Sequence, residues 1–92
     1  MSIAIVGGND RMVRNYKDLC KSYNCKAKVF TQPAGIREKI GSPDLLILFT
    51  NTVSHKMVAA ALAATSLEDH QIVRCHSSSI TALKGILENV AQ

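Results

Sequence analysis

The sequence predicts an α/β fold of the flavodoxin- or Rossmann-like type. A four-stranded parallel sheet, ordered 2-1-3-4, is expected between two layers of helices in a three-layer sandwich. Three observations predict it: strand-like and helix-like patterns alternate along the chain, their connections are short, and the run DLLILFT (44–50) is almost wholly apolar. Continuous apolar runs suit strands that are covered on both faces, so residues 44–50 are placed at the centre of the sheet.

The chain begins with a strand, a turn and a helix. Residues 2–6 (SIAIV) form a short run rich in β-branched side chains, and the pair Gly7-Gly8 ends it. Residues 11–23 follow with apolar side chains at helical spacing, namely Met12, Tyr16, Leu19 and Tyr23. The glycines therefore mark a tight strand-to-helix turn.

The next unit is shorter. Residues 26–31 (KAKVFT) alternate between polar and apolar side chains, as a second strand would. The stretch QPAG (32–35) then leads into a short helical segment that ends near Gly41. The apolar run at 44–50 comes directly after this segment.

The second half of the chain repeats the alternation. Residues 54 to about 67 are rich in alanine and predict a helix, residues 71–75 (QIVRC) predict a fourth strand, and residues 79–90 predict a closing helix. Right-handed crossovers would bring all four strands parallel. Because 92 residues, 47% of them hydrophobic, suffice for one core but hardly for two, residues 1–92 are expected to form a single domain.

The composition limits the compartment and the binding partners that can be expected for this protein. No stretch approaches the length of a membrane span and the start lacks a secretory pattern, so a cytoplasmic protein is expected. Three cysteines without a CxxC pair fit free thiols in a reducing compartment. The net charge of +4 favours anionic partners, but scattered basic residues and 4% aromatics make nucleic acid an unlikely one.

Polar residues gather where the predicted strands end. In an open parallel sheet the strand-to-helix loops emerge at one edge, where ligands usually bind, so these side chains should meet in space. The candidate ligand-binding residues are Gly7, Gly8, Arg11, Asn51, Thr52, His55, Lys56, His76, Ser77, Ser78 and Ser79.

Helix capping and anion binding are alternative explanations for these residues. Thr52 or Ser54 can cap one helix, and Ser78 or Ser79 the last one. Capping does not explain the basic residues. Helix N-termini prefer acidic side chains, yet His55 and Lys56 occupy a first helical turn. A bound anion would turn that repulsion into attraction; the alternative is that the basic side chains are simply solvated.

Known catalytic and metal-binding patterns do not fit. The glycine pair lacks the spacing of GxGxxG or of a P-loop, HSSS lacks the glycines of a nucleophile elbow, and the central strand ends on Thr50 and Asn51 rather than on aspartate. No CxxC or HxxxH spacing predicts zinc. The sequence therefore favours a binding module over an enzyme.

Four segments together resemble a known bacterial family. VGGNDRMVRNYK, KVFTQPAG, DLLILFTNTVSHKM and RCHSSSITALKGIL cover most of the chain. They resemble a family of unknown function whose members are linked to iron and haem, the "domain related to iron" group. The resemblance implies a small soluble α/β protein that binds haem through histidine and moves or buffers it.

The same resemblance implies candidate iron ligands. His76 of RCHSSS is implied as the first ligand, whereas His55 of VSHKM lies in a motif without an assigned role. Toward the end of the first helix, where a partner histidine would be sought, the chain has Leu19, Cys20 and Lys21, so either Cys20 replaces that histidine or haem binding does not extend to this member. The haem propionates would then lie near Arg11 or Lys56.

Three functions therefore remain open: haem binding or trafficking, binding of phosphate or a nucleotide by a regulatory domain, and protein interaction. A sheet this small leaves its edge strands open, and symmetric dimers are the commonest soluble oligomers. A two-fold homodimer is accordingly expected.

Overall fold

The four strands that the structure contains within residues 1–90 all run parallel, in the order β2-β1-β3-β4, which confirms the predicted topology. The structure is a computed structural model, and it describes residues 1–90. The strands are β1 (Ser2–Val6), β2 (Lys26–Phe30), β3 (Leu45–Phe49) and β4 (Ile72–Cys75).

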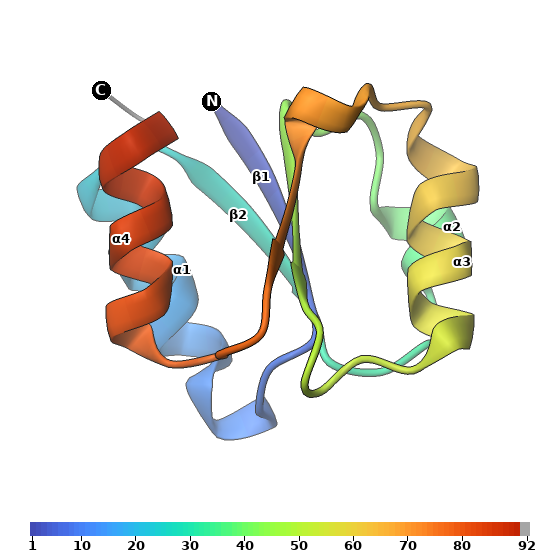
Figure 1. The fold of residues 1–92 in the computed structure, drawn as a ribbon, viewed down its shortest axis with the longest axis horizontal. Coiled ribbons are helices and arrows are strands. Elements are labelled where there is room, and N and C mark those ends of the chain that lie inside the picture. Colours follow the sequence, from blue (N-terminus) through green and yellow to red (C-terminus); the bar gives the residue numbers. More distant parts are fainter. Residues whose placement is uncertain (91–92) are drawn as a thin grey trace.

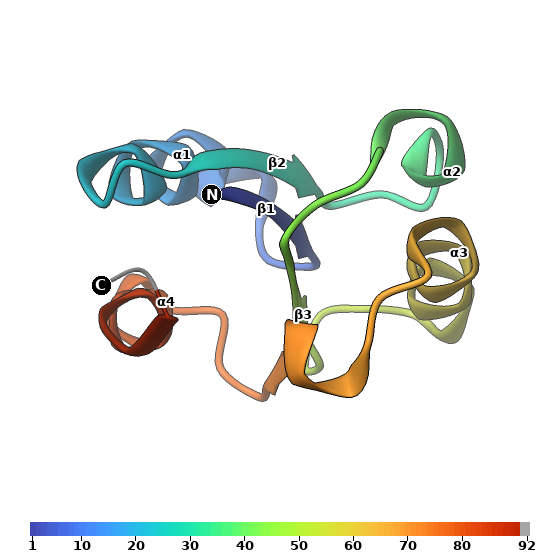
Figure 2. The same cartoon turned by 90° about the horizontal axis from the view of Figure 1, so that it is seen from above.

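Helices cover both faces of the sheet, as the sequence predicts. Figures 1 and 2 show α1 (Val13–Ser22) and α4 (Ile80–Val90) on one face, and α2 (Ile36–Lys39) and α3 (His55–Thr65) on the other. Two 3-10 turns, η1 (Asp10–Met12) and η2 (Asp69–Gln71), precede α1 and β4. The first predicted helix therefore begins with a 3-10 turn, because the Asn9 side chain accepts the Arg11 N–H at 2.9 Å and starts η1.

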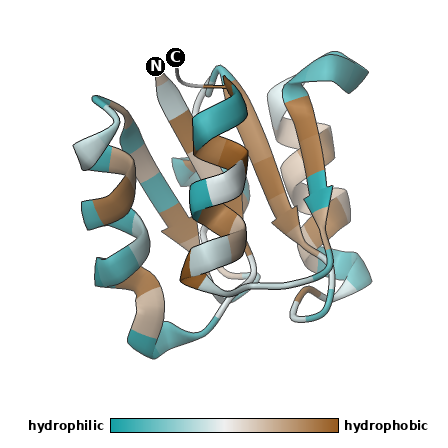
Figure 3. Ribbon diagram, turned by 60° about the vertical axis from the view of Figure 1, so that its left-hand side comes forward, coloured by the Kyte–Doolittle hydropathy of each residue, from teal (hydrophilic) through white to brown (hydrophobic). Residues whose placement is uncertain are grey.

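The core lies on both sides of β3. All five residues of β3 are buried, with exposed fractions of at most 4%. On one face Ile47 and Phe49 join Tyr16 of α1 and Leu83 of α4; on the other, Leu48 packs with residues of α2 and α3. Figure 3 shows the hydrophobic strands between helices that carry hydrophilic residues. The double burial explains why DLLILFT lacks polar alternation.

The outer strands are β2 and β4, and both carry exposed cations. Lys26 and Lys28 of β2 are exposed, and so is Arg74 of β4. Charged side chains on edge strands oppose uncontrolled strand pairing. Two-fold self-association remains a prediction.

No helix within residues 1–90 combines the length and apolarity that are needed to cross a membrane.

Asp44 connects the amino ends of β1 and β3. Its carboxylate accepts the Ser2 N–H at 2.8 Å, and its own N–H donates to the Ser2 carbonyl at 2.9 Å. The Ser2 N–H lowers the pKa of Asp44 below its ordinary value, since the bond favours the ionised carboxylate, and the Ser2 hydroxyl acts in the same direction.

This shift predicts an acid-dependent loss of stability. The pKa of Asp44 is lower in the folded than in the unfolded chain. The ionised Asp44 carboxylate therefore stabilises the fold above about pH 4, and this stabilisation is lost as the pH falls through the pKa of Asp44 in the folded chain. Asp44→Asn should lower the melting temperature at pH 7 and narrow the difference between pH 7 and pH 3, as followed by circular dichroism. Asp18→Asn, an exposed aspartate of α1, is the matched control, and an equal pH response in both variants would contradict the assignment.

Candidate functional site

The glycine turn after β1 lies against the loop that follows β3. Gly7 and Gly8 both have positive φ angles, of 107° and 88°. The Gly8 N–H donates to Thr52 Oγ1 at 2.7 Å, and Thr52 Oγ1 donates to the Phe49 carbonyl at 3.1 Å. Since α1 and α3 leave toward opposite faces, this contact lies at the switch point of the sheet, where α/β proteins often bind ligands.

Side chains of the chain itself fill this switch point. A Cβ atom on Gly7 would lie 2.7 Å from Val53 Cγ1 and 3.0 Å from the Phe49 carbonyl oxygen. A Cβ atom on Gly8 would lie 2.7 Å from Cε2 of Tyr16. The glycines thus permit close packing of two loops, and Thr52 connects the loops rather than capping a helix.

This packing gives a test of the turn. Gly7→Ala should destabilise the protein by about 2 kcal/mol or more, because alanine disfavours the positive φ and its Cβ would collide with Val53 and with backbone. Gly85→Ala is the matched control: no neighbouring atom of residues 1–90 lies within 4 Å of its Cβ position in α4, so helix propensity should raise stability by roughly 0.5–1 kcal/mol. Urea unfolding measures both. Equal effects of the two substitutions would contradict this account of the turn.

The HSSS segment leaves the sheet beside the end of β3. The ladder between β3 and β4 pairs Phe49 with Cys75, and the Thr50 N–H extends it by donating to the Cys75 carbonyl at 2.9 Å. Thr50 and His76 therefore leave the sheet as neighbours, and the exposed Asn51 follows. The His76 side chain is exposed.

The three serines of this segment have structural roles. Ser79 Oγ accepts the Ala82 N–H at 3.1 Å and so caps α4. Of the two explanations that the sequence leaves open for these serines, helix capping and anion binding, this bond supports capping by Ser79. Ser77 and Ser79 hydroxyls lie 3.1 Å apart, and the Ser78 carbonyl accepts the Tyr16 hydroxyl at 2.6 Å. The segment is thereby fastened to α1.

The structure divides the basic candidates between the two faces. Arg11 belongs to η1, which leads into α1, and His76 begins the connection from β4 to α4, whereas His55 and Lys56 begin α3, which covers the other face. Ser54 Oγ accepts the Met57 N–H at 3.2 Å and caps α3. The predicted residues share one sheet edge, but they do not converge on one pocket.

Lys56 lines a cavity of about 350 Å³ between α2 and α3. Arg37 of α2 adds a second cation, and Glu38 a carboxylate. Uncharged residues complete the lining: Pro33, Ala34, Gly35, Ala59 and Ala60. The sequence analysis did not include Arg37 among the candidate residues. The sequence shows that Arg37 lies in a short helical segment, but it does not show that this segment packs beside the helix that starts at His55.

Cys20 does not lie with His76. Its side chain is completely buried, and burial together with neighbouring Cys25 raises the pKa of the Cys20 thiol to about 11. The Cys20 carbonyl accepts the Cys25 N–H at 3.0 Å, next to the start of β2, so Cys20 lies toward the amino edge of the sheet whereas His76 follows the carboxyl end of β4. A protonated, buried thiol is a poor iron ligand.

The residues present do not fit a haem held by His76 and Cys20. A porphyrin needs apolar contact, yet within residues 1–90 the one large hydrophobic side chain that is exposed belongs to Met1, at the amino edge. The described residues also form no cluster of three or more metal-ligating side chains of the kinds His, Cys, Asp and Glu. Haem binding remains a prediction that rests on His76.

Thiol alkylation tests the placement of the cysteines. Cys75 is partly exposed, whereas Cys20 is buried and Cys25 is 5% exposed. Iodoacetamide should modify Cys75 at least about tenfold faster than Cys20 in the folded protein, because alkylation requires an accessible thiolate. Peptide mass spectrometry measures the rates, with the guanidinium-unfolded chain as control. Rapid native labelling of Cys20 would restore it as a candidate ligand.

Residues 2–90 match an uncharacterized protein family that is conserved in bacteria, DUF2325. The chain belongs to this family. Neither the curated proteins nor the solved structures gave a match. Membership in DUF2325 confirms the resemblance to a bacterial family of unknown function.

Proposed function

We propose that this DUF2325 chain is a binding module that accepts a small phosphate-bearing anion between α2 and α3. The observation that carries the proposal is the pair of cations, Arg37 and Lys56, on one cavity of about 350 Å³. With Glu38, the lining has a net charge of +1. The sequence places the anion at the strand-end edge with Ser77, Ser78 and Ser79 as donors. The cavity shares only Lys56 with the predicted residues, because the three serines precede α4 on the other face of the sheet.

The start of α3 supports the same ligand class. Ser54 satisfies the Met57 N–H, and the first turn carries no acidic residue while His55 and Lys56 bring basic side chains to it. Cations at the positive end of a helix are unfavourable by roughly 0.3–1 kcal/mol each. A phosphate group near Lys56 would compensate for this repulsion.

Size and lining indicate binding rather than chemistry. A volume of about 350 Å³ lies at the lower end of the range for small-molecule pockets, which suits a phosphate with a small organic part. Alanines on α3 give an apolar wall, and Arg37 supplies a fork that matches phosphate oxygens. Within the part of the chain that the structure describes, no hydroxyl or thiol side chain lines the cavity.

Thermal shift with inorganic phosphate, AMP and ATP tests the proposal. A ligand at one hundred times its dissociation constant stabilises the folded chain by about 2.7 kcal/mol, so the melting temperature should rise clearly. Lys56→Ala and Arg37→Ala should each weaken binding about tenfold or more, since each removes a charge-assisted contact. Lys84→Ala, an exposed lysine of α4 outside the cavity, is the matched control.

Two results would contradict the proposal: the absence of a shift with every phosphate compound, or an equal loss in Lys84→Ala and Lys56→Ala. His76→Ala separates the haem alternative. It should leave the phosphate shift unchanged, because His76 does not line the cavity. If added haemin instead gives a Soret band that His76→Ala removes, haem binding replaces the anion proposal.

A further inference from the structure

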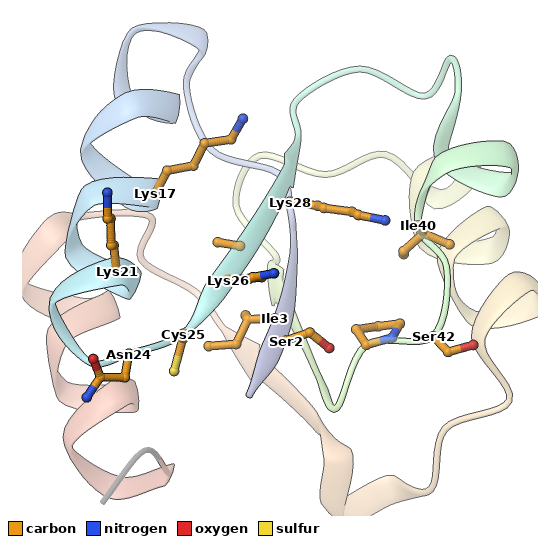
Figure 4. A pocket seen from close by; sticks show the side chains of 12 residues that line it. Ser2, Ile3, Lys17, Lys21, Asn24, Cys25, Lys26, Lys28, Ile40 and Ser42 are labelled. Carbon is orange, nitrogen blue, oxygen red and sulfur yellow. The ribbon is translucent and has the colours of Figure 1, made fainter.

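A second, larger groove runs along the edge strand β2. Figure 4 shows it between α1 and the segment that joins α2 to β3, with a volume of about 720 Å³. Uncharged residues contribute to its lining, among them Ile3, Cys25, Ala27, Ile40 and Pro43. The groove exposes one strand of the sheet along its outer side.

The backbone of β2 offers hydrogen-bonding groups to this groove. The Lys26 N–H donates to the Met1 carbonyl at 3.0 Å, and the Phe30 carbonyl accepts the Gly7 N–H at 2.8 Å, so these residues of β2 face β1. Alternate residues of a strand turn their backbone groups to opposite sides. Ala27 and Val29 therefore direct N–H and C=O groups away from β1, toward the open edge.

Lysines flank this edge on both sides. Lys17 and Lys21 come from α1 on one face of the sheet, and Lys26 and Lys28 from β2 itself (Figure 4). Among residues 1–90, no aspartate or glutamate lines the groove. Lys28 Nζ also donates to the Lys39 carbonyl at 2.8 Å, which fixes that side chain at the end of α2. The groove thus combines the unpaired edge of β2, uncharged side chains and the positive charge of the lysines.

We propose that β2 binds an extended acidic segment of another protein, which adds to the sheet as a fifth strand. Main-chain hydrogen bonds to Ala27 and Val29 would supply affinity, and lysines on both faces would select acidic side chains at successive positions of the segment. The described residues of the lining include no aromatic side chain on which a base could stack, which favours a peptide over nucleic acid.

A second copy of this chain is a poorer occupant of the same edge. Two-fold antiparallel pairing of β2 with itself, centred on Ala27, would place Lys26 of one copy opposite Lys28 of the other. Like charges directly across paired strands are destabilising. The lysines therefore oppose self-pairing of β2 and favour an acidic partner.

Peptide binding followed by NMR tests this inference. The probe is a blocked octapeptide of glutamate and valine, with glutamates on both faces of the extended chain. Binding should slow the hydrogen exchange of the Ala27 and Val29 amides, since the new strand would pair with them. The same peptide with alternate backbone nitrogens methylated keeps its charge but loses its donors, and it should bind at least about tenfold more weakly. A glutamine-for-glutamate peptide tests the need for charge.

Charge reversal in the protein completes the test. The double variant Lys21→Glu, Lys26→Glu changes one lysine on each side of the groove and should weaken the acidic peptide about tenfold or more. Arg74→Glu, Lys84→Glu is the matched control: it makes the same change in net charge on β4 and α4, outside the groove. Circular dichroism verifies that both variants fold.

The inference is overturned by any of three outcomes: equal binding of the methylated peptide, unchanged exchange at Ala27 and Val29, or equal weakening in the two double variants. Tighter binding of a single-stranded oligonucleotide that displaces the peptide would likewise replace it by nucleic-acid binding. Phosphate binding between α2 and α3 depends on Arg37 and Lys56, so the two proposals fail or succeed separately.

Discussion

Burial of β3 on both faces is the constraint on which the rest of the structure depends. Each of its large side chains contributes roughly 1.5–3 kcal/mol by leaving water, and this requires a neighbouring strand on each side and a helical layer on each face. Phe49 shows the coupling to the rest of the core: its ring lies 5.4 Å from that of Tyr16, whose hydroxyl bonds the Ser78 carbonyl. One aromatic pair thereby links β3, α1 and the start of α4.

Parallel packing around β3 brings every strand-to-helix loop to one edge, and there the polar groups largely bond one another. Thr52 bridges to Gly8, Ser79 caps α4, and the Thr31 hydroxyl donates to the Asp10 carboxylate. Thr52, Ser79 and Asp10 are exposed, so these bonds cap a helix and join loops rather than satisfy buried groups, and an edge rich in hydroxyls need not be a ligand site. The basic side chains at this edge differ from the hydroxyl groups, because hydroxyl groups in the loops do not neutralise a positive charge.

The order of the strands was predictable because it follows from a strong local signal. The run at 44–50 is apolar on both faces, and alternating strands and helices leave few topologies open. The cap of α4 at Ser79 was predictable for the same reason, since capping acts over three residues. The bond between Gly8 and Thr52 joins residues 44 positions apart, and no local pattern specifies such a pair.

The site was less predictable because charge depends on which elements become neighbours. Lys56 stood out as a cation in a first helical turn, but Arg37 joins it because α2 and α3 pack on the same face. Cys20 is periodic with the apolar face of α1, alongside Tyr16, and this spacing explains its burial and its separation from His76. The lysines of the β2 groove appeared scattered because two lie on a helix and two on a strand.

The two cationic surfaces differ in what they can recognise, although they have the same sign of charge. Arg37 and Lys56 face a cavity of about 350 Å³, so a ligand there must be small and its charge concentrated. The β2 groove is about twice as large and includes a strand edge, so it can select a repeated backbone as well as charge. Attraction between exposed charges is weakened by salt, whereas main-chain pairing is much less affected. Geometry therefore separates a phosphate from an acidic peptide where net charge alone would not.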